Sequence, residues 1–242
     1  MRTMQSSQRF IGVCAALFIG SAALTIGWYG SMSSMMPMCG TRGMPSTMRG
    51  AAAFGVMWLT MMVAMMLPSL MPMLLRYRQT VGATTTARLD ALTGVVAIGY
   101  FLVWAVLGAF AFFADATLST FEMHWPPATG SFVLIAGALQ FSRWKAHHLA
   151  CCRDAPACCG ARLAEGTSAL RYGVHLGIHC VHCCFGLTVV LLALGMMDLR
   201  AMALVTAAIW LERLAPDGLR VARFVGGILI ASGTLLIAHA MS

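Results

Sequence analysis

Residues 55–74 read GVMWLTMMVAMMLPSLMPML, a stretch that contains no charged side chain. A run of about 20 apolar residues is long enough to cross the hydrocarbon core of a bilayer as a helix. Across all 242 residues, 60% are hydrophobic and only 10% are charged, which is far from the usage of an average soluble domain. The chain is therefore predicted to be an all-α, polytopic membrane protein embedded in the lipid bilayer.

Seven apolar stretches are predicted to form a transmembrane helical bundle. The sixth is the weakest, because Glu212 and Arg213 end it early. The first is predicted to be an uncleaved anchor, because no small-residue cleavage site follows it. No internal repeat is visible, so residues 1–242 are predicted to form one transmembrane domain. The predicted spans lie near 10–29, 51–75, 91–114, 130–150, 172–197, 199–215 and 220–240.

The basic residues test this count, because cytoplasmic segments of membrane proteins carry an excess of Lys and Arg. With the N-terminus inside, seven spans put 13 of the 16 basic residues in cytoplasmic segments and 3 outside, at Arg42, Arg49 and Arg200. The sequence therefore predicts seven spans with the C-terminus outside. Since the net charge of +8 comes from residues that anchor and orient helices, nucleic-acid binding is not expected.

Soft sulfur ligands are abundant on both predicted sides of the membrane, with 20 Met and 9 Cys in the chain. Thioethers and thiolates suit Cu(I), and thiolates also suit zinc and iron–sulfur clusters. The predicted periplasmic loop 31–50 has little aliphatic content and is rich in Met, which favours capture of a soft metal over a loop resting on headgroups. Its candidate ligands are Met35, Met36, Met38 and Cys39.

The second predicted span carries methionines at helical spacing. Met57, Met61 and Met65 fall on one face at i, i+4 and i+8, and Met62, Met66 and Met73 fall on another. Such a ladder of thioethers could pass Cu(I) along the helix axis. Stripe spacing alone favours the alternative that flexible Met side chains fill gaps beside a proline kink.

The fifth predicted span contains YGVHLGIHCVHCC, residues 172–184. Helical geometry puts three histidines on a narrow face, bordered by one cysteine, with two more cysteines turning away from it. Ionisable side chains at this depth are costly in lipid, and three histidines beside CxxCC favour a metal site over hydrogen-bonded imidazoles and inert thiols. The candidate ligands are His175, His179, Cys180, His182, Cys183 and Cys184.

Cys180 and Cys183 also form a CxxC pair, which leaves a second hypothesis open. Paired thiols in a membrane helix could exchange disulfides with a quinone or a partner protein. Against this, Cys180 follows Arg171, predicted to be cytoplasmic, by nine residues. At 1.5 Å per residue that is only about 13 Å into the membrane, on the inner half, whereas such relays need access from the oxidising side.

The predicted cytoplasmic link, 151–170, begins with two vicinal cysteine pairs spaced as CCx5CC. In a reducing compartment such clusters favour metal binding over disulfides, and the alternative is free thiols in a loop. Beyond the link, Glu212 is predicted to pair with a basic residue of another helix, because Arg213 beside it cannot face it. The alternative is that Glu212 is a carboxylate ligand. The candidate ligands at the link are His148, Cys151, Cys152, Cys158 and Cys159.

Five sequence blocks occur in the order WLTMMVAMMLPSLMPML, GYFLVW, KAHHLACCRDAP, YGVHLGIHCVHCC and GMMDLRAMALVTAAIWLERL. Together they resemble the family designated domain of unknown function 2182, bacterial proteins described as predicted metal-binding integral membrane proteins. The resemblance extends over residues 54–236. It implies a helical bundle of the bacterial inner membrane with a metal site, and no established activity.

The resemblance places the AMMLPS methionines of that family on Met65 and Met66. Its CxGCC cysteines fall on Cys180, Cys183 and Cys184.

The acidic–basic pair of that family falls on Glu212 and Arg213, with Arg where Lys is usual. Two departures exchange or add a ligand-capable side chain: His182 stands where the family has glycine, and His148 stands where it has a cysteine. Both departures point toward metal and leave its identity open.

These observations predict a non-enzymatic inner-membrane protein that binds a soft transition metal, most simply Cu(I), and transfers or transports it. Zinc and iron remain open as alternative metals. The expected partners are a metallochaperone or a larger membrane protein complex. The alternatives are a thiol–disulfide oxidoreductase and a non-catalytic subunit of a larger membrane enzyme.

Overall fold

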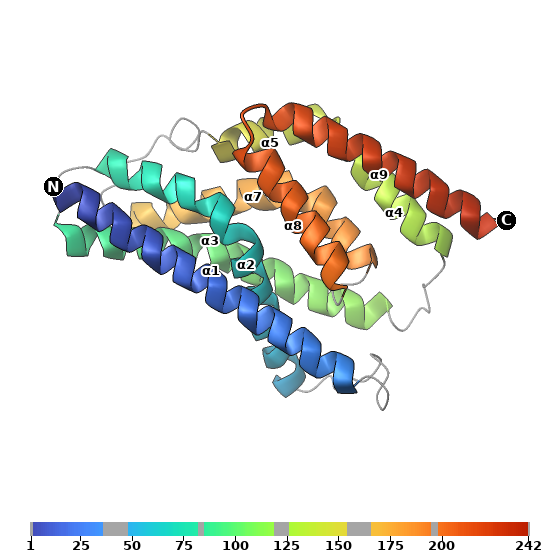
Figure 1. The fold of residues 1–242 in the computed structure, drawn as a ribbon, viewed down its shortest axis with the longest axis horizontal. Helices are drawn as coiled ribbons and strands as arrows, with labels where there is room; N and C mark the ends of the chain where they lie inside the picture. Colours follow the sequence, from blue (N-terminus) through green and yellow to red (C-terminus); the bar gives the residue numbers. More distant parts are fainter. Residues whose placement is uncertain are drawn as a thin grey trace. The chain divides into compact units, whose positions relative to one another are not determined.

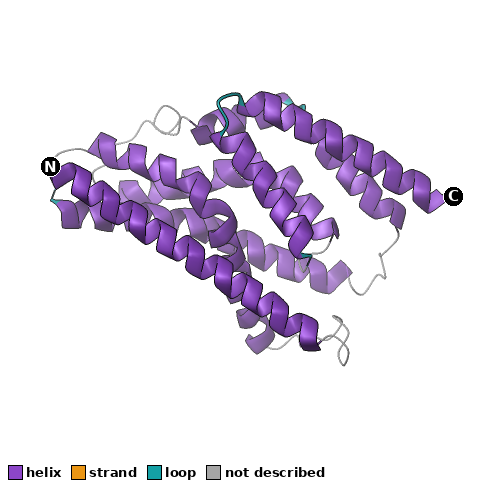
Figure 2. Ribbon diagram, in the orientation of Figure 1, coloured by secondary structure: helices purple, strands orange, loops and turns teal. Residues whose placement is uncertain are grey.

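The structure is a computed structural model that describes residues 2–35, 48–81, 85–118, 126–153, 166–194 and 198–241. Every regular element in these ranges is a helix, which confirms the predicted all-α class (Figures 1 and 2). The helices are α1 (Arg2–Met35), α2 (Met48–Val81), α3 (Thr86–Leu118), α4 (Pro126–Leu139), α5 (Arg143–Arg153), α7 (Gly166–Leu194), α8 (Leu199–Leu214) and α9 (Gly218–Met241).

Five of these helices are long and apolar enough to cross a membrane, and each overlaps a predicted span. The chain is therefore a multi-pass membrane protein. The five segments are Gln8–Trp28 in α1, Ala52–Val81 in α2, Thr86–Phe113 in α3, Thr167–Leu194 in α7 and Gly218–Ala240 in α9.

The predicted count of seven is wrong for the described residues, and the stretch 130–150 is one reason. It divides into α4 and α5, because the backbone between them makes short-range bonds, among them Phe141 N to Ala138 O at 3.1 Å. The Ser142 hydroxyl then accepts from the Lys145 backbone N–H at 3.1 Å and begins α5 as an N-cap. The apolar part of α4, Thr129–Leu139, is too short to be a span by itself.

The stretch 199–215 is the second reason. Its helix, α8, has 16 residues, and at 1.5 Å per residue it is about 24 Å long, whereas the hydrocarbon core is about 30 Å thick. Both ends are fixed: the Asp198 carboxylate accepts from the Arg200 and Ala201 N–H groups, and Pro216 follows the last turn. The predicted sidedness of the termini and links depends on seven crossings, so it stays a prediction.

The helices form two compact units by their internal contacts. The first combines residues 1–116 with 155–178, and the second combines 117–154 with 179–242. Helix α7 belongs to the first unit up to Ile178 and to the second from His179 onward.

In the first unit, α2 and α3 are joined by an indole and a glycine. The Trp58 Nε1 donates to the Trp104 carbonyl at 2.8 Å, and Gly108 leaves room for the Trp58 ring. The start of α7 packs on α3 equally closely, since a methyl group added at Gly99 would lie 2.7 Å from the Leu170 carbonyl oxygen. Glycine is needed at such a crossing because any side chain would separate the two backbones.

In the second unit, α4 lies along α9 (Figure 1). A methyl group at Gly137 of α4 would lie 2.9 Å from the Gly226 carbonyl of α9, and one at Gly233 would lie 2.9 Å from the Gly130 carbonyl. The remaining helices of this unit, α5, α8 and the end of α7, carry the polar side chains described next.

Candidate metal centre

Three cysteines of α7 are packed inside the second unit. Cys180, Cys183 and Cys184 are each no more than 1% exposed. The Cys184 thiol is hydrogen-bonded to both Cys180 and Cys183. The α7 cysteines therefore form one contiguous group of sulfur atoms, as helical spacing requires of residues three and four apart.

Helix α5 adds a fourth thiol to this group. Cys152 is fully buried and is hydrogen-bonded to Cys183. The four residues Cys152, Cys180, Cys183 and Cys184 are called the thiol cluster below. None of the six described cysteines is in a disulfide, so the cluster offers reduced sulfur ligands from two helices.

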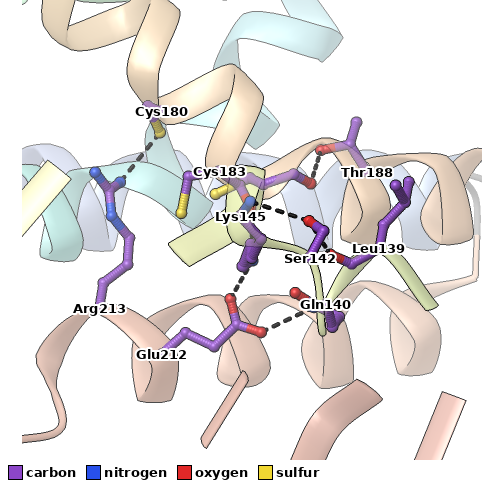
Figure 3. Close-up of polar contacts among 10 residues, drawn as sticks. Leu139, Gln140, Ser142, Lys145, Cys180, Cys183, Thr188, Glu212 and Arg213 are labelled. Carbon is purple, nitrogen blue, oxygen red and sulfur yellow. Dashed lines mark hydrogen bonds and ion pairs between the residues drawn. The ribbon is translucent and has the colours of Figure 1, made fainter. Parts of the chain in front are cut away.

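A guanidinium from α8 reaches the thiol cluster. Arg213, which is 6% exposed, donates from Nη1 to the Cys180 Sγ at 3.1 Å (Figure 3). Guanidinium stays protonated in proteins, so a fixed positive charge lies beside this sulfur. Such a charge favours the thiolate form of sulfur, which is the form that binds metals.

Next to Arg213 along α8, Glu212 forms a buried ion pair with α5. The Lys145 Nζ donates to Glu212 Oε2 at 2.6 Å and to the Cys183 carbonyl at 2.6 Å. The Gln140 Nε2 donates to the other carboxylate oxygen at 2.9 Å (Figure 3). Because Lys145 binds α8 and the backbone of α7 together, this network holds the helices that carry the thiol cluster. The pairing predicted for Glu212 with a basic residue of another helix is confirmed.

Beside the thiols lies a group of imidazoles from the same two helices. The Nδ1 atoms of His148 on α5 and His179 on α7 are 3.0 Å apart. The His148 ring also stacks on His182, with centroids 4.8 Å apart, and Trp144 packs edge-on against both His148 and His182. The residues His148, His179 and His182 are called the imidazole group below.

Burial lowers the pKa of His148 from its usual value, and His182 and His179 lower it further. A lowered pKa keeps the imidazole neutral near pH 7, so a ring nitrogen has a lone pair available. The imidazole group is only partly buried, in contrast to the thiols. The imidazole group therefore offers nitrogen ligands in a partly exposed site, and the thiol cluster offers sulfur ligands in a buried one.

The donor types fit a soft cation such as copper, since imidazole and thiolate both bind it. Within the described parts of the chain, no three His, Cys, Asp or Glu side chains are placed so that they could hold one metal ion. A metal ion entering here thus finds pairs of neighbouring donors, and a third ligand would have to move toward it.

Most of the predicted ligands of the fifth span meet in this region. His179, His182 and the three α7 cysteines do so, together with His148 and Cys152 of α5. Cys151 lies beside them, with its sulfur 3.9 Å from the His147 Nε2. His175 lies one turn earlier on α7 and is an exposed residue of the first unit.

The predicted methionine ligands of α2 belong to the first unit and are buried there. Met61, Met62, Met65 and Met66 are 3%, 1%, 2% and 0% exposed. Met35 is the last residue of α1, and its side chain is outside what the structure describes. Met36, Met38, Cys39, Cys158 and Cys159 lie outside the described residues altogether.

Lys145, Gln140 and Trp144 are parts of the site that no sequence motif marks. From the sequence, Lys145 is only one of the basic residues of a predicted cytoplasmic segment. The sequence does indicate that Lys145 needs a partner, because a charged side chain next to an apolar run is costly to bury alone. The two helices that supply its partners, α7 and α8, are distant in sequence, so the contact could not be found from spacing.

A family model described as "PpoB2: Copper chaperone" matches residues 55–236, well over half of the chain. It confirms a copper-related family over nearly the same residues as the resemblance noted above, without carrying that family's designation. No curated protein and no solved structure matches the chain.

Proposed function

The chain belongs to this copper chaperone family, and on that premise we propose that the thiol cluster binds Cu(I) inside the membrane protein and releases it to a partner protein. The observation that carries the proposal is the series of contacts that links four buried cysteines and joins one of them, Cys180, to Arg213. Soft thiolates favour Cu(I) over harder cations.

The charges around the cluster support a monovalent metal. Two thiolates and one Cu(I) ion carry a net charge of −1, and an isolated charge is costly to bury. The Arg213 guanidinium beside Cys180 offsets that charge. Because Lys145 is already neutralised by Glu212, the ion pair adds little net charge and instead holds α5 and α8 against the cluster.

Release would proceed by ligand exchange, in which sulfur or nitrogen ligands of a partner replace the cluster thiolates one at a time. No electron is transferred in such a step, and each freed thiolate takes up a proton or remains paired with Arg213. Pairs of neighbouring donors suit this chemistry, because a two-coordinate Cu(I) ion leaves positions open for an incoming ligand.

We also propose that the buried thioethers of α2, Met61, Met62, Met65 and Met66, pass Cu(I) in transit. Thioethers bind Cu(I) without losing a proton, so they can do so in an apolar helix. Under this proposal they affect the rate of copper movement, and the thiol cluster determines its equilibrium binding.

The test is the copper stoichiometry of the purified, full-length protein in detergent. We expect the wild type to hold Cu(I) in competition with a chromogenic chelator such as bicinchoninate, and Cys180→Ser and Cys183→Ser to lose it. Cys14→Ser is the matched control, because Cys14 is also a buried cysteine but lies on α1 in the first unit. A wild type that holds no Cu(I) would refute the proposal.

Thiol–disulfide exchange is the second candidate, and the contact between Cys152 and Cys183 is the observation that favours it. Joining these thiols as a disulfide would release two electrons and two protons, which a membrane quinone could accept. Copper-free protein whose Cys152 and Cys183 cycle with quinone would support this candidate in place of copper binding.

A further inference from the structure

The imidazole group contains a pair of nitrogens that face each other across two helices. The His148 Nδ1 and the His179 Nδ1 are 3.0 Å apart, and their ring centroids are 5.2 Å apart. Two imidazolium rings in this position would repel each other, so at least one Nδ1 presents a lone pair to the other. With one ring donating and the other accepting, this contact is a hydrogen bond between two good copper ligands.

The pair lies at the edge of the thiol cluster. On α7, Cys183 follows His179 by four residues, which places the two side chains about 5–6 Å apart at their Cβ atoms. On α5, Cys152 follows His148 by four residues in the same way. On α5 and α7, His148 therefore lies against His179, and one turn later Cys152 lies against Cys183.

The imidazole group and the thiol cluster differ in their exposure to solvent. The three residues of the imidazole group are half-buried, and His147 beside them is exposed, whereas the four thiols are at most 1% exposed. An ion that approaches along α5 thus meets nitrogen ligands before it meets sulfur ligands.

We propose that His148 and His179 form a separate entry site, at which Cu(I) binds between the two Nδ1 atoms before it moves to Cys183. This inference rests on the proposed function of the thiol cluster. The proton on the donating Nδ1 moves by way of water to the Nε2 of the same ring as the metal enters, so both rings stay neutral and no electron is transferred. With metal–nitrogen distances of about 2 Å, an in-line ion needs the two nitrogens roughly 4 Å apart, so the rings must open by about 1 Å.

Transfer onward is favoured because a soft thiolate binds Cu(I) more tightly than imidazole does. His182 stacks on His148 and keeps that ring in place, so it acts as a positioning residue for the pair. In this arrangement the histidines control how fast copper enters, and the cysteines control how tightly it is held.

The experiment compares the rate of loading with the affinity at equilibrium, using the full-length protein and Cu(I) supplied as its bicinchoninate complex. We expect His148→Ala and His179→Ala to slow loading about tenfold while changing the equilibrium affinity by less than about threefold, a difference of under 1 kcal/mol. His175→Ala, on the same helix but exposed and in the first unit, should load at the wild-type rate.

His148→Asn separates ligation from structure, because an amide can keep a hydrogen bond to His179 but is a poor ligand for Cu(I). It should fold as the wild type does and load as slowly as His148→Ala. Wild-type loading by this variant would overturn the entry site.

An equal loss of rate and affinity in the histidine variants would also overturn it, since the histidines would then belong to the holding site. A wild type that binds no Cu(I) at all would refute the proposed function itself. The spectroscopic test replaces all four residues of the thiol cluster by serine, and X-ray absorption of the copper that this variant still takes up should show nitrogen neighbours. Copper without nitrogen neighbours would overturn the entry site.

Discussion

Each unit of the protein contains an ion pair between two helices at the same separation, 2.6 Å. In the first unit Arg78 of α2 binds Asp90 of α3, whose side chain is 56% exposed. In the second unit Lys145 binds Glu212, whose side chain is 1% exposed. The two cations are equally buried, with side chains 5% and 4% exposed, so the two pairs differ in how far water reaches the carboxylate.

A buried ion pair is a poor way to gain stability, because desolvation of both groups offsets most of their attraction. Apolar side chains of similar volume would hold α5 and α8 together as well. The Lys145–Glu212 pair adds something that apolar side chains would not, which is a hydrogen bond to the backbone carbonyl of Cys183. Under the proposed function, this contact is a reason to keep the pair, because it holds the backbone of the helix that carries the thiol cluster.

The candidate copper ligands of the two units also differ in their surroundings. The α2 methionines lie in a helix that also packs by aromatic contacts, such as Phe54 on Trp58. The α7 cysteines contact another thiol and a guanidinium from two other helices. We therefore expect the α7 cysteines to bind copper at equilibrium and the α2 methionines not to do so. Three predictions test this comparison.

The largest expected effect is on stability. Glu212→Ala should lower the free energy of unfolding by about 3–5 kcal/mol, because it leaves the Lys145 ammonium buried without its carboxylate. Asp90→Ala should lower it by less, because water reaches the exposed Asp90 carboxylate and already screens that pair, and because Arg78 keeps a second partner in the Thr93 hydroxyl. Thermal unfolding of the detergent-solubilised protein measures both.

The control for this prediction is the double variant Lys145→Met with Glu212→Leu, which removes both charges and keeps the volume. It should recover most of the stability lost in Glu212→Ala. Similar losses for Glu212→Ala and Asp90→Ala would contradict the distinction between the two pairs.

The second prediction concerns the guanidinium at the thiol cluster. Arg213→Met should weaken Cu(I) binding by about 1.5–3 kcal/mol, the usual range for a hydrogen bond to a charged group. Arg213→Lys should lose less, because it keeps the charge and gives up only the planar fork of donors. Chelator competition measures both affinities.

Arg200→Met is the matched control, since Arg200 is an exposed arginine of the same helix. It should bind Cu(I) as the wild type does. Unchanged affinity in Arg213→Met would show that the thiols hold copper without help from the neighbouring charge.

The sequence predicted five of the spans well, because length and hydropathy are local properties. It failed at 130–150, where one predicted span is two short helices, and at 199–215, where the helix forms but is too short to cross the bilayer. At the first, the Ser142 hydroxyl caps a new helix; at the second, Asp198 and Pro216 limit the length. Hydropathy averaged over a window cannot detect a break made by two or three residues.

The candidate site was predictable to the extent that it lies on one helix. Periodicity brought Cys180, Cys183 and Cys184 together, because residues three and four apart are neighbours in any helix. The contacts of Cys152 and Arg213 with these thiols depend on how α5 and α8 pack, which no spacing rule contains. The expectation that Glu212 needs a partner was correct because burying an unpaired charge is prohibitive, but the partner itself came only from the structure.

The smallest expected effect is on the first unit. Met62→Leu combined with Met66→Leu conserves volume and should cost little stability. It should change the equilibrium Cu(I) affinity by no more than about twofold, because mutations at independent sites usually leave each other's energies unchanged within about 0.5 kcal/mol. If these thioethers carry copper in transit, uptake of Cu(I) by reconstituted vesicles should nevertheless be slower than with the wild type. A loss of affinity like that of Cys180→Ser would instead make the α2 methionines ligands of the holding site and remove the distinction between the units.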